Sequence, residues 1–295
     1  MGYGSFTAGD WQKLRKSRSI DEKSTNELFT SRSADAKYDP KFIGKREARD
    51  SEEHPNSTPI IIGVDVTGSM GYLSTNIIQK SLRDLMEMLY STDKITDPQL
   101  MFAAIGDASV DTAPLQVTQF ESDIRIAEQL LDLWLENKGG DFPEDYELLW
   151  YFADKHTDID SFTKYGRKGF CFTIGDAPFH DTLKKRDIKK IFDDDVMFNI
   201  SSKELAKRAS KKYELFHIAI GDKPCNASNI IPGRVIHIEK SQIDYLPEIL
   251  VSVMQKVMGV PLETVLEQWG ELSREVVKQS VSSLRIANNN NQIVL

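Results

Sequence analysis

A short corner between two predicted elements carries the residues that are best placed to do chemistry. An apolar run that begins at Ile60 leads into Asp65-Val66-Thr67-Gly68-Ser69, and a helical pattern begins almost directly after Gly71. An aspartate at the end of a buried strand needs a partner, because an isolated carboxylate is costly to bury. The hydroxyls and glycines of this corner suit four chemistries: a phosphate cradle, a nucleophilic serine, a phosphorylated aspartate, or a metal site.

Residue spacing disfavours the phosphate cradle and the serine nucleophile. The corner matches neither GxxxxGK[ST] nor GxGxxG, and no lysine follows its glycines. A nucleophile elbow needs GxSxG, and Thr67 replaces its first glycine. With Ser69 as nucleophile, Asp176 or Asp222 and then His237 would follow in chain order. However, this strand opens the domain, whereas an elbow strand usually follows several others. His237 also lies in an apolar strand, where a core histidine is expected.

The phosphorylated aspartate is a closer alternative. Haloacid-dehalogenase-type phosphotransferases use an aspartate after a buried strand, and a carboxylate nucleophile is chemically reasonable. Residues 175–181 also fit the loose GDxxxxD motif that holds Mg²⁺ in those enzymes. Against this, Thr67 stands where soluble phosphatases have their acid/base aspartate, and the helical pattern after Gly71 leaves no room for their flap. An Mg²⁺-dependent aspartyl phosphotransferase that uses Asp65 is therefore the alternative to the metal site.

The metal site accounts for the largest number of residues. Besides the corner, "GGDFPED" occupies residues 139–145 and "IGDAPFH" occupies residues 174–180. In these three segments the sequence resembles a von Willebrand factor A (vWA) domain with a metal-ion-dependent adhesion site. The resemblance is to an intracellular subtype with DxTGSM, GGDxPE and DAPxH motifs, and it covers about residues 58–259.

The physics of the corner is compatible with this resemblance. Residues 65, 67 and 69 alternate around a loop and can aim a carboxylate and two hydroxyls at one point. Mg²⁺ takes oxygen ligands in near-octahedral geometry and keeps some water, and Mn²⁺ or Ca²⁺ are alternative ions. The resemblance implies that Thr67 and Ser69 coordinate directly and that Asp65 and Asp176 bind directly or through water. An open position would then take a carboxylate from a partner protein.

The middle loop leaves the role of Asp141 open. Many adhesion-type vWA domains place a threonine there as a direct ligand, and this chain offers Asp141 instead. With Glu144 three residues later, Asp141 also forms a capping box in front of a helix predicted at 146–153. Asp141 is therefore expected to be a metal contact or an N-cap. A direct contact would add negative charge and make the ion less attractive to an acidic partner.

Periodicity predicts the elements that position these residues. Strands are predicted at 60–66, 99–108, 113–120, 168–177, 213–222 and 233–240, with helical patterns between them. This alternation predicts an α/β sandwich around a mainly parallel sheet, where ligands gather at the carboxyl ends of the strands. Four aspartates lie at or just past such ends: Asp65, Asp107, Asp176 and Asp222. The vWA resemblance implies a Rossmann-like three-layer α/β/α sandwich with one antiparallel edge strand.

Three regions are expected along the chain. Residues 1–57 are polar and of mixed charge, and their apolar residues follow neither the helical nor the strand periodicity. They are expected to form an extended arm. Residues 58–259 are expected to form the vWA domain, and residues 260–295 a helical extension and tail packed on it.

Composition narrows the class of partner. The net charge of −8 over 295 residues disfavours a nucleic-acid binder, and no apolar run reaches the length of a membrane helix. The first 20 residues lack the apolar segment of a secretion signal, and two cysteines make a disulfide framework improbable. A cytoplasmic protein is expected.

The expected function is that of a non-enzymatic adaptor that binds an acidic side chain of a partner protein through Mg²⁺. By analogy alone, the partner is expected to be an AAA+ ATPase or a component of a larger assembly. No nucleic acid, membrane or small-molecule substrate is expected. A metal-free scaffold that binds through its arm and C-terminal helices is a third alternative.

Overall fold

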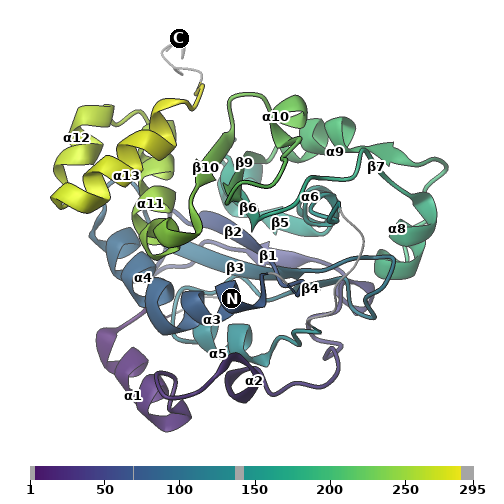
Figure 1. The fold of residues 1–295 in the computed structure, drawn as a ribbon, viewed down its shortest axis with the longest axis horizontal. Coiled ribbons are helices and arrows are strands. Elements are labelled where there is room, and N and C mark those ends of the chain that lie inside the picture. Colours follow the sequence, from purple (N-terminus) through teal and green to yellow (C-terminus); the bar gives the residue numbers. More distant parts are fainter. Residues whose placement is uncertain (1–3, 69, 137–142, 287–295) are drawn as a thin grey trace.

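A six-stranded sheet forms the centre of the computed structural model, which describes residues 4–68, 70–136 and 143–286. The sheet has the order β10-β9-β6-β2-β3-β4, and every neighbouring pair is parallel except β3 and β4 (Figure 1). The strands are β2 (Thr58–Asp65), β3 (Pro98–Ile105), β4 (Leu115–Val117), β6 (Gly169–Gly175), β9 (Tyr213–Ile220) and β10 (Val235–Ile238). The expected three-layer Rossmann-like sandwich, with one antiparallel strand at the edge of the sheet, is confirmed.

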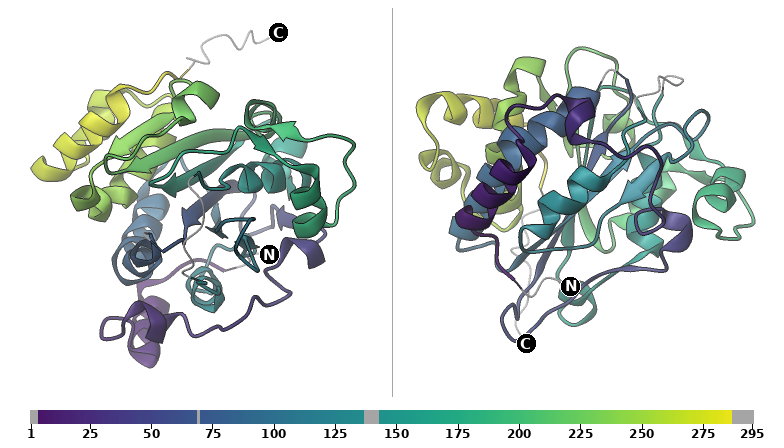
Figure 2. Two further views of the ribbon diagram at one scale, coloured as in Figure 1. Left: turned by 45° about the vertical axis from the view of Figure 1, so that its right-hand side comes forward. Right: turned by 90° about the horizontal axis from the view of Figure 1, so that it is seen from below.

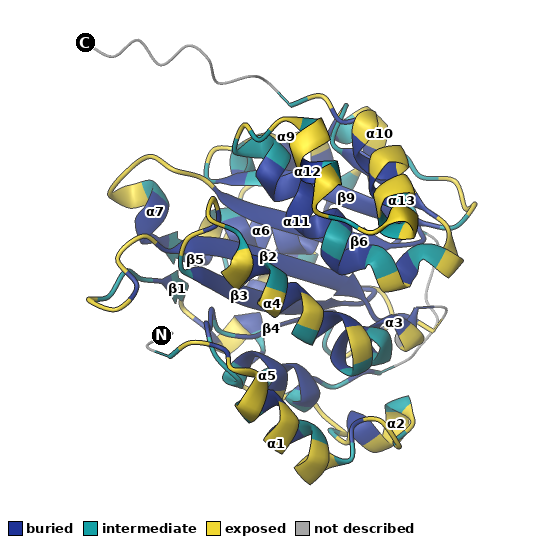
Figure 3. Ribbon diagram, turned by 90° about the vertical axis from the view of Figure 1, so that its left-hand side faces the viewer, coloured by how far each residue is buried: buried dark blue, intermediate teal, exposed yellow. Residues whose placement is uncertain are grey.

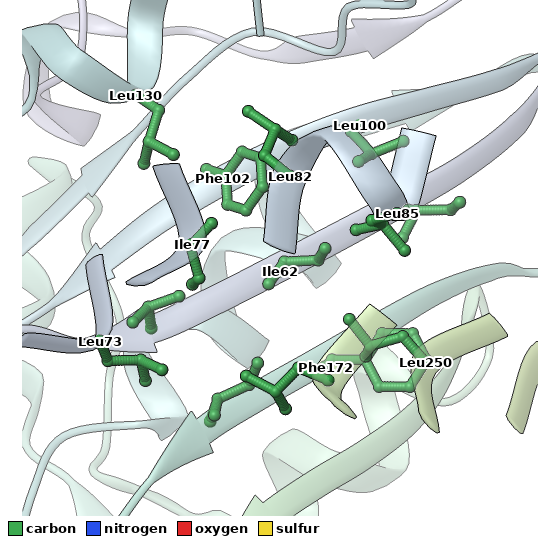
Figure 4. Packing of buried hydrophobic residues seen from close by; sticks show 14 of the residues in the cluster. Ile62, Leu73, Ile77, Leu82, Leu85, Leu100, Phe102, Leu130, Phe172 and Leu250 are labelled. Atoms are coloured by element: carbon green, nitrogen blue, oxygen red, sulfur yellow. The ribbon is translucent and has the colours of Figure 1, made fainter. Parts of the chain in front are cut away.

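Alternate residues of the strands face two helical layers, because successive side chains of a strand point to opposite faces. One layer contains α3 (Gly71–Asn76), the π-helical turn η2 (Ile77–Ser81), α4 (Leu82–Ser91), α5 (Arg125–Asp132) and α11 (Leu246–Val257). Figure 4 shows Ile62, Phe102 and Phe172 of the sheet packed among side chains of this layer, which we call the α4 layer. The other layer contains α6 (Glu147–Lys155), α8 (Lys185–Phe192) and α9 (Ser202–Ala209), and it covers Ile61, Met101 and Cys171.

Smaller elements connect these layers. β1 (Arg46–Ala48) pairs in parallel with β5 (Thr157–Ile159), and β7 (Thr182–Leu183) pairs with β8 (Ile200–Ser201). The short helices are α7 (Asp160–Thr163), α10 (Ala227–Ile230) and the 3₁₀ turn η3 (Lys240–Tyr245).

One expectation about a strand side chain is wrong. His237 was expected in the core, but it is exposed, because β10 is the edge strand at the end of the sheet opposite β4. The histidine that is buried in the sheet is His217 of β9, whose ring bonds the Thr173 hydroxyl at 2.9 Å. Cys171 is fully buried, as expected for an inert thiol, and burial raises its pKa.

Residues 4–57 are more structured than the expected extended arm. They form α1 (Ala8–Arg18), α2 (Thr25–Leu28), the 3₁₀ turn η1 (Pro40–Phe42) and β1. Figures 2 and 3 show α1 lying along the outside of the α4 layer, with its outer face exposed. Only Trp11 and Leu14 of α1 are buried, so its apolar stripe is too narrow to show as a period in the sequence.

The arm is fixed to the domain by contacts at several points. The Gln79 side chain donates to the carbonyl oxygens of Ile20 and Lys23, at 2.8 and 3.0 Å. At the far edge of the sheet, the backbone N–H of Val117 in β4 donates to the carbonyl oxygen of Tyr38 at 2.9 Å. The arm therefore runs from the α4 layer across the outer edge of β4. The domain boundaries near residues 57 and 259 stay predictions.

The C-terminal helices pack on α11. They are α12 (Leu262–Glu267) and α13 (Glu271–Ser282). The Trp269 indole donates to the Ser252 hydroxyl at 2.8 Å, and Val277 and Val281 join the core of the α4 layer. Across the described ranges, the helices are all too short or too polar to span a bilayer.

Candidate metal site

Three of the predicted site residues lie at the carboxyl ends of two adjacent central strands. Asp65 is the last residue of β2 and is fully buried, and Thr67 follows it by two positions. Asp176 follows β6 directly and is only 5% exposed. Because β2 and β6 pair in parallel, the loops that carry these residues leave the same edge of the sheet side by side. Ser69 and Asp141, the other two predicted ligands, lie outside the described residues.

Hydrogen bonds fix both oxygens of the Asp65 carboxylate. Oδ1 accepts from the backbone N–H and the hydroxyl of Thr67, at 2.9 and 2.6 Å. Oδ2 accepts from the Tyr146 hydroxyl at 2.8 Å. Burial raises the pKa of Asp65, the bonds from Thr67 and Tyr146 oppose this, and the charge of Asp176 raises the pKa further. The Asp65 and Asp176 carboxylates are therefore close enough to repel each other.

Tyr146 is a site residue that the sequence analysis missed. Its hydroxyl donates to Asp65 and accepts from the backbone N–H of Ala177 at 3.3 Å, so it connects the loops after β2 and β6. Burial raises the pKa of Tyr146 far above its usual value, and the Asp65 charge adds to this, so the hydroxyl keeps its proton. A Cβ at Gly175 would lie 1.9 Å from this hydroxyl, which explains a glycine at the end of β6.

Lys223 provides a positive charge at the site. Its ammonium nitrogen lies 2.8 Å from Oδ2 of Asp176, and its side chain is 44% exposed. Lys223 follows β9, the strand on the other side of β6 from β2. Asp222 was predicted at this strand end and the neighbouring lysine was not, because the direction of the lysine side chain depends on the turn after Gly221 (φ +77°).

Of the two alternatives left open for Asp141, the capping box with Glu144 does not fit the start of helix α6, and Asp141 itself lies outside the described residues. Helix α6 begins at Glu147 with Tyr146 at the N-cap position, so the helix start does not fall at Asp141. The backbone N–H of Glu144 instead donates to the Pro178 carbonyl oxygen at 2.9 Å, in the loop that follows Asp176. This bond brings Glu144 to the site.

Glu144 is a buried carboxylate beside the predicted ligands. The residue is 6% exposed, and within the described ranges its Oε2 has no hydrogen-bond partner. Burial raises its pKa to about 9, and the charges of Asp65 and Asp107 contribute in the same direction. A contact with the Thr67 side chain acts in the opposite direction.

The loop after β3 closes the site on its other side. Asp107 is 1% exposed, and its Oδ1 accepts from the backbone N–H and the hydroxyl of Ser109, both at 2.6 Å. Oδ2 of Asp145 accepts from the backbone N–H of Ala108 at 2.6 Å. Asp107 therefore lies in a loop beside the site, and Asp145 holds this loop against the segment that contains Glu144.

The chemistry of the side chains fits a hard divalent ion. Carboxylates and a hydroxyl supply oxygen ligands, which Mg²⁺, Mn²⁺ and Ca²⁺ prefer. Among the residues that the structure describes, Oε2 of Glu144 has no hydrogen-bond partner, and a cation would satisfy such a buried atom. Among the described residues, no group of three or more His, Cys, Asp or Glu side chains is arranged to hold a metal ion. A site of the expected type completes its ligands with hydroxyls, and Ser69 is outside the described ranges.

Comparisons with known proteins show similarity in structure. No protein-family model matches the chain, and no curated protein matches its sequence. Similar solved structures include proximal thread matrix protein 1 from the mussel byssus, with 12% identity, a TM-score of 0.44, and coverage of 67% of this chain and 48% of that one. Another structure of that protein, described as having a zinc-occupied MIDAS motif, has 11% identity, a TM-score of 0.44, and coverage of 71% and 49%.

A third similar structure is the pilus adhesin SpaC from Lactobacillus rhamnosus GG, with 9% identity, a TM-score of 0.43, and coverage of 72% of this chain and 31% of that one. The present chain thus spans half or less of the length of these proteins. The assignment of the fold rests on the strand order itself, and the assignment of the site rests on its residues.

Proposed function

We propose that the chain is a metal-dependent protein-interaction module. Its site holds one divalent ion, Mg²⁺ in preference to Mn²⁺ or Ca²⁺, through Asp65, Thr67, Ser69 and Asp176, with Asp141 as a further ligand. An acidic side chain of a partner protein binds at the open position of the ion. When bound, the ion supplies a Lewis-acidic position for that carboxylate.

One observation carries this proposal: Asp65, Thr67 and Asp176 converge at the ends of the two central strands, and both aspartates are buried. Buried carboxylates that repel each other need a cation or a proton nearby. The ammonium of Lys223 neutralises the negative charge of Asp176. A divalent ion would neutralise the negative charge of Asp65. Tyr146 holds Asp65 in a fixed orientation, as a preorganised ligand requires.

The proposed partner is a protein, in the cytoplasm, that presents an Asp or Glu side chain. An AAA+ ATPase or a component of a larger assembly is the proposed class, by analogy with intracellular vWA proteins. The free cysteines Cys171 and Cys225 are compatible with a reducing compartment.

The metal site can be tested by titration of the protein with Mn²⁺. Binding is measured by isothermal calorimetry and by the electron paramagnetic resonance signal of the free ion. We expect one ion to bind, and Asp65→Asn to weaken binding about tenfold or more, because the variant keeps the size of the side chain and loses its charge. Asp193→Asn removes an exposed carboxylate elsewhere and should bind as the wild type does. Absence of Mn²⁺ binding to the folded wild-type protein would contradict the proposal.

The partner can then be tested by capture in Mg²⁺ and in EDTA, with identification of the captured proteins by mass spectrometry. A true partner should be lost both in EDTA and with Asp65→Asn, and should be retained with Asp193→Asn. Replacing individual acidic residues of that partner by amides should identify the carboxylate that binds. Capture that ignores both EDTA and Asp65→Asn would exclude a metal bridge.

The phosphotransferase alternative is less compatible with the geometry of Asp65. Thr67, which stands at the position of the acid/base aspartate of soluble phosphatases, donates its backbone N–H and hydroxyl to Asp65 and has no carboxyl group for acid/base catalysis. Helix α3 begins at Gly71, which leaves no flap between the corner and the helix. A phosphotransferase should form a beryllofluoride adduct at Asp65 or hydrolyse an aryl phosphate, and we expect neither.

A further inference from the structure

Glu144 is held between the two loops that carry the proposed ligands. Its backbone N–H bonds the Pro178 carbonyl oxygen at 2.9 Å, and a β-bridge connects it with Phe179. Two residues later, the Tyr146 hydroxyl bonds Asp65. These contacts fix the backbone on both sides of the Glu144 side chain and place its carboxylate beside Thr67.

The surroundings of the Glu144 carboxylate are acidic. The charges that act on it most strongly belong to Asp65, Asp107 and Asp145, and Thr67 contributes the contact from its side chain. Oε2 is shielded from solvent and lacks a hydrogen-bond partner in the part of the chain that the structure describes. The nearby ammonium of Lys223 pairs with Asp176.

Such an arrangement is unfavourable without a cation. A buried carboxylate oxygen without a donor costs free energy, and neighbouring carboxylates increase that cost. A divalent ion beside Asp65 and Thr67 would be attracted by Glu144 and would satisfy its oxygen. We propose that Glu144 supplies a carboxylate ligand to the ion of this site, an inference that rests on the proposed metal-binding function.

A consequence is that the chain holds its ion more strongly before a partner arrives, because Glu144 adds one negative charge beside Asp65 and Thr67. The partner's carboxylate then adds to a loaded site and is not needed to retain the ion. Without Glu144, retention of the ion depends more strongly on the partner.

The test compares Glu144→Gln with Glu147→Gln. Both residues are buried, at 6% and 0% exposure, and both changes replace a carboxyl group by an amide, at Glu144 three residues before α6 and at Glu147, its first residue. We expect Glu144→Gln to weaken Mn²⁺ binding about tenfold or more, and Glu147→Gln to change it less than about twofold. In EDTA, both variants should have a higher melting temperature than the wild type. Mn²⁺ raises the melting temperature further, and only Glu144→Gln should reduce this second increase.

The possible outcomes separate this inference from the proposed function. If Asp65→Asn weakens Mn²⁺ binding and Glu144→Gln leaves it unchanged, the site is correct and Glu144 is not a ligand. If the wild-type protein does not bind Mn²⁺, both proposals fail. Should Glu144→Gln not fold, judged by circular dichroism, Glu144→Asp takes its place, because it keeps the charge and withdraws the carboxylate by one methylene. The Glu144→Asp variant should also weaken Mn²⁺ binding. If this variant binds Mn²⁺ as the wild type does, the inference is wrong.

Discussion

Tyr146 is the residue that connects the fold with the orientation of Asp65. Its hydroxyl lies against Gly175, bonds the Asp65 carboxylate and receives the backbone N–H of Ala177. Removing this hydroxyl leaves Oδ2 of Asp65 buried without its donor, which costs about 1–3 kcal/mol.

We therefore expect Tyr146→Phe to lower the free energy of unfolding in urea by about 2 kcal/mol and to weaken Mn²⁺ binding. Tyr213→Phe is the matched control, because Tyr213 is equally buried and its hydroxyl bonds the neutral Thr157 hydroxyl at 2.8 Å. The control should lose about 1 kcal/mol and leave Mn²⁺ binding unchanged. Equal effects of the two variants on Mn²⁺ binding would assign Tyr146 a purely structural role.

Lys223 is expected to compete with the metal ion for Asp176. An ammonium 2.8 Å from this carboxylate repels a second cation beside it. Lys223→Gln should therefore tighten Mn²⁺ binding, by about threefold to tenfold, in calorimetric titrations. Lys94→Gln makes the same change at an exposed position before β3, at the opposite edge of the sheet, and should have no effect. Weaker binding by Lys223→Gln would mean that the lysine holds Asp176 in position for the ion.

At the scale of elements, the N-terminal arm contributes to the core. Trp11 is 1% exposed and packs in the α4 layer, whereas Phe42 on the same arm is 67% exposed. Trp11→Ala should lower the free energy of unfolding by about 3–5 kcal/mol, and Phe42→Ala should change it by less than about 0.5 kcal/mol. Urea unfolding followed by circular dichroism measures both. A small effect of Trp11→Ala would show that the arm detaches easily and acts as a separate segment.

The sequence predicted all six strands of the central sheet, because buried strands such as β2 and β6 are continuous apolar runs, but the predicted runs extend up to three residues beyond the strands. It placed Asp65, Thr67 and Asp176 at one edge of the sheet for the same reason. It did not predict α1, whose contact with the domain depends on two buried side chains, Trp11 and Leu14. Such a contact is decided by tertiary packing and leaves no periodic signal.

The sequence also missed the residues that complete the site. Glu144 was interpreted as part of a capping box, because its spacing from Asp141 fits that motif. The start of α6 at Glu147 excludes this interpretation, and the bond from Glu144 to Pro178 depends on two loops that meet only in the folded chain. Tyr146 and Lys223 likewise gain their roles from contacts over a distance in sequence.

At the scale of the whole molecule, buried carboxylates should make stability depend on pH. Glu147 is fully buried; burial raises its pKa well above the usual value, and the charges of Asp145 and Asp181 add to this. A carboxyl group with a raised pKa in the folded state contributes stability below its unfolded pKa of about 4.3, and this contribution is lost as pH rises toward the folded pKa. The metal-free protein should therefore lose stability from about pH 5 upward.

Glu147→Gln removes this dependence. In urea unfolding with EDTA, the free energy of unfolding of the variant relative to the wild type should rise as the pH is raised from 5 to 8, because only the wild type loses the contribution of Glu147. Glu204→Gln, at a partly exposed position on α9 where the carboxylate pairs with Arg208, should show a difference that changes by less than about 0.5 kcal/mol over this range. A difference for Glu147→Gln that does not change with pH would show that the carboxyl group ionises normally in the folded protein.

The path of the arm across the outer edge of β4 has a consequence for synthesis. The arm is synthesised well before its partners: Arg46 contacts Val117, 71 residues on, and Arg49 contacts Asp160, 111 residues on. At typical rates of translation, the arm waits on the order of 5–20 s for these residues. During that time Trp11, Ile20 and Phe29, which are buried in the folded protein, lack part of the structure that covers them, so this segment stays exposed in the nascent chain.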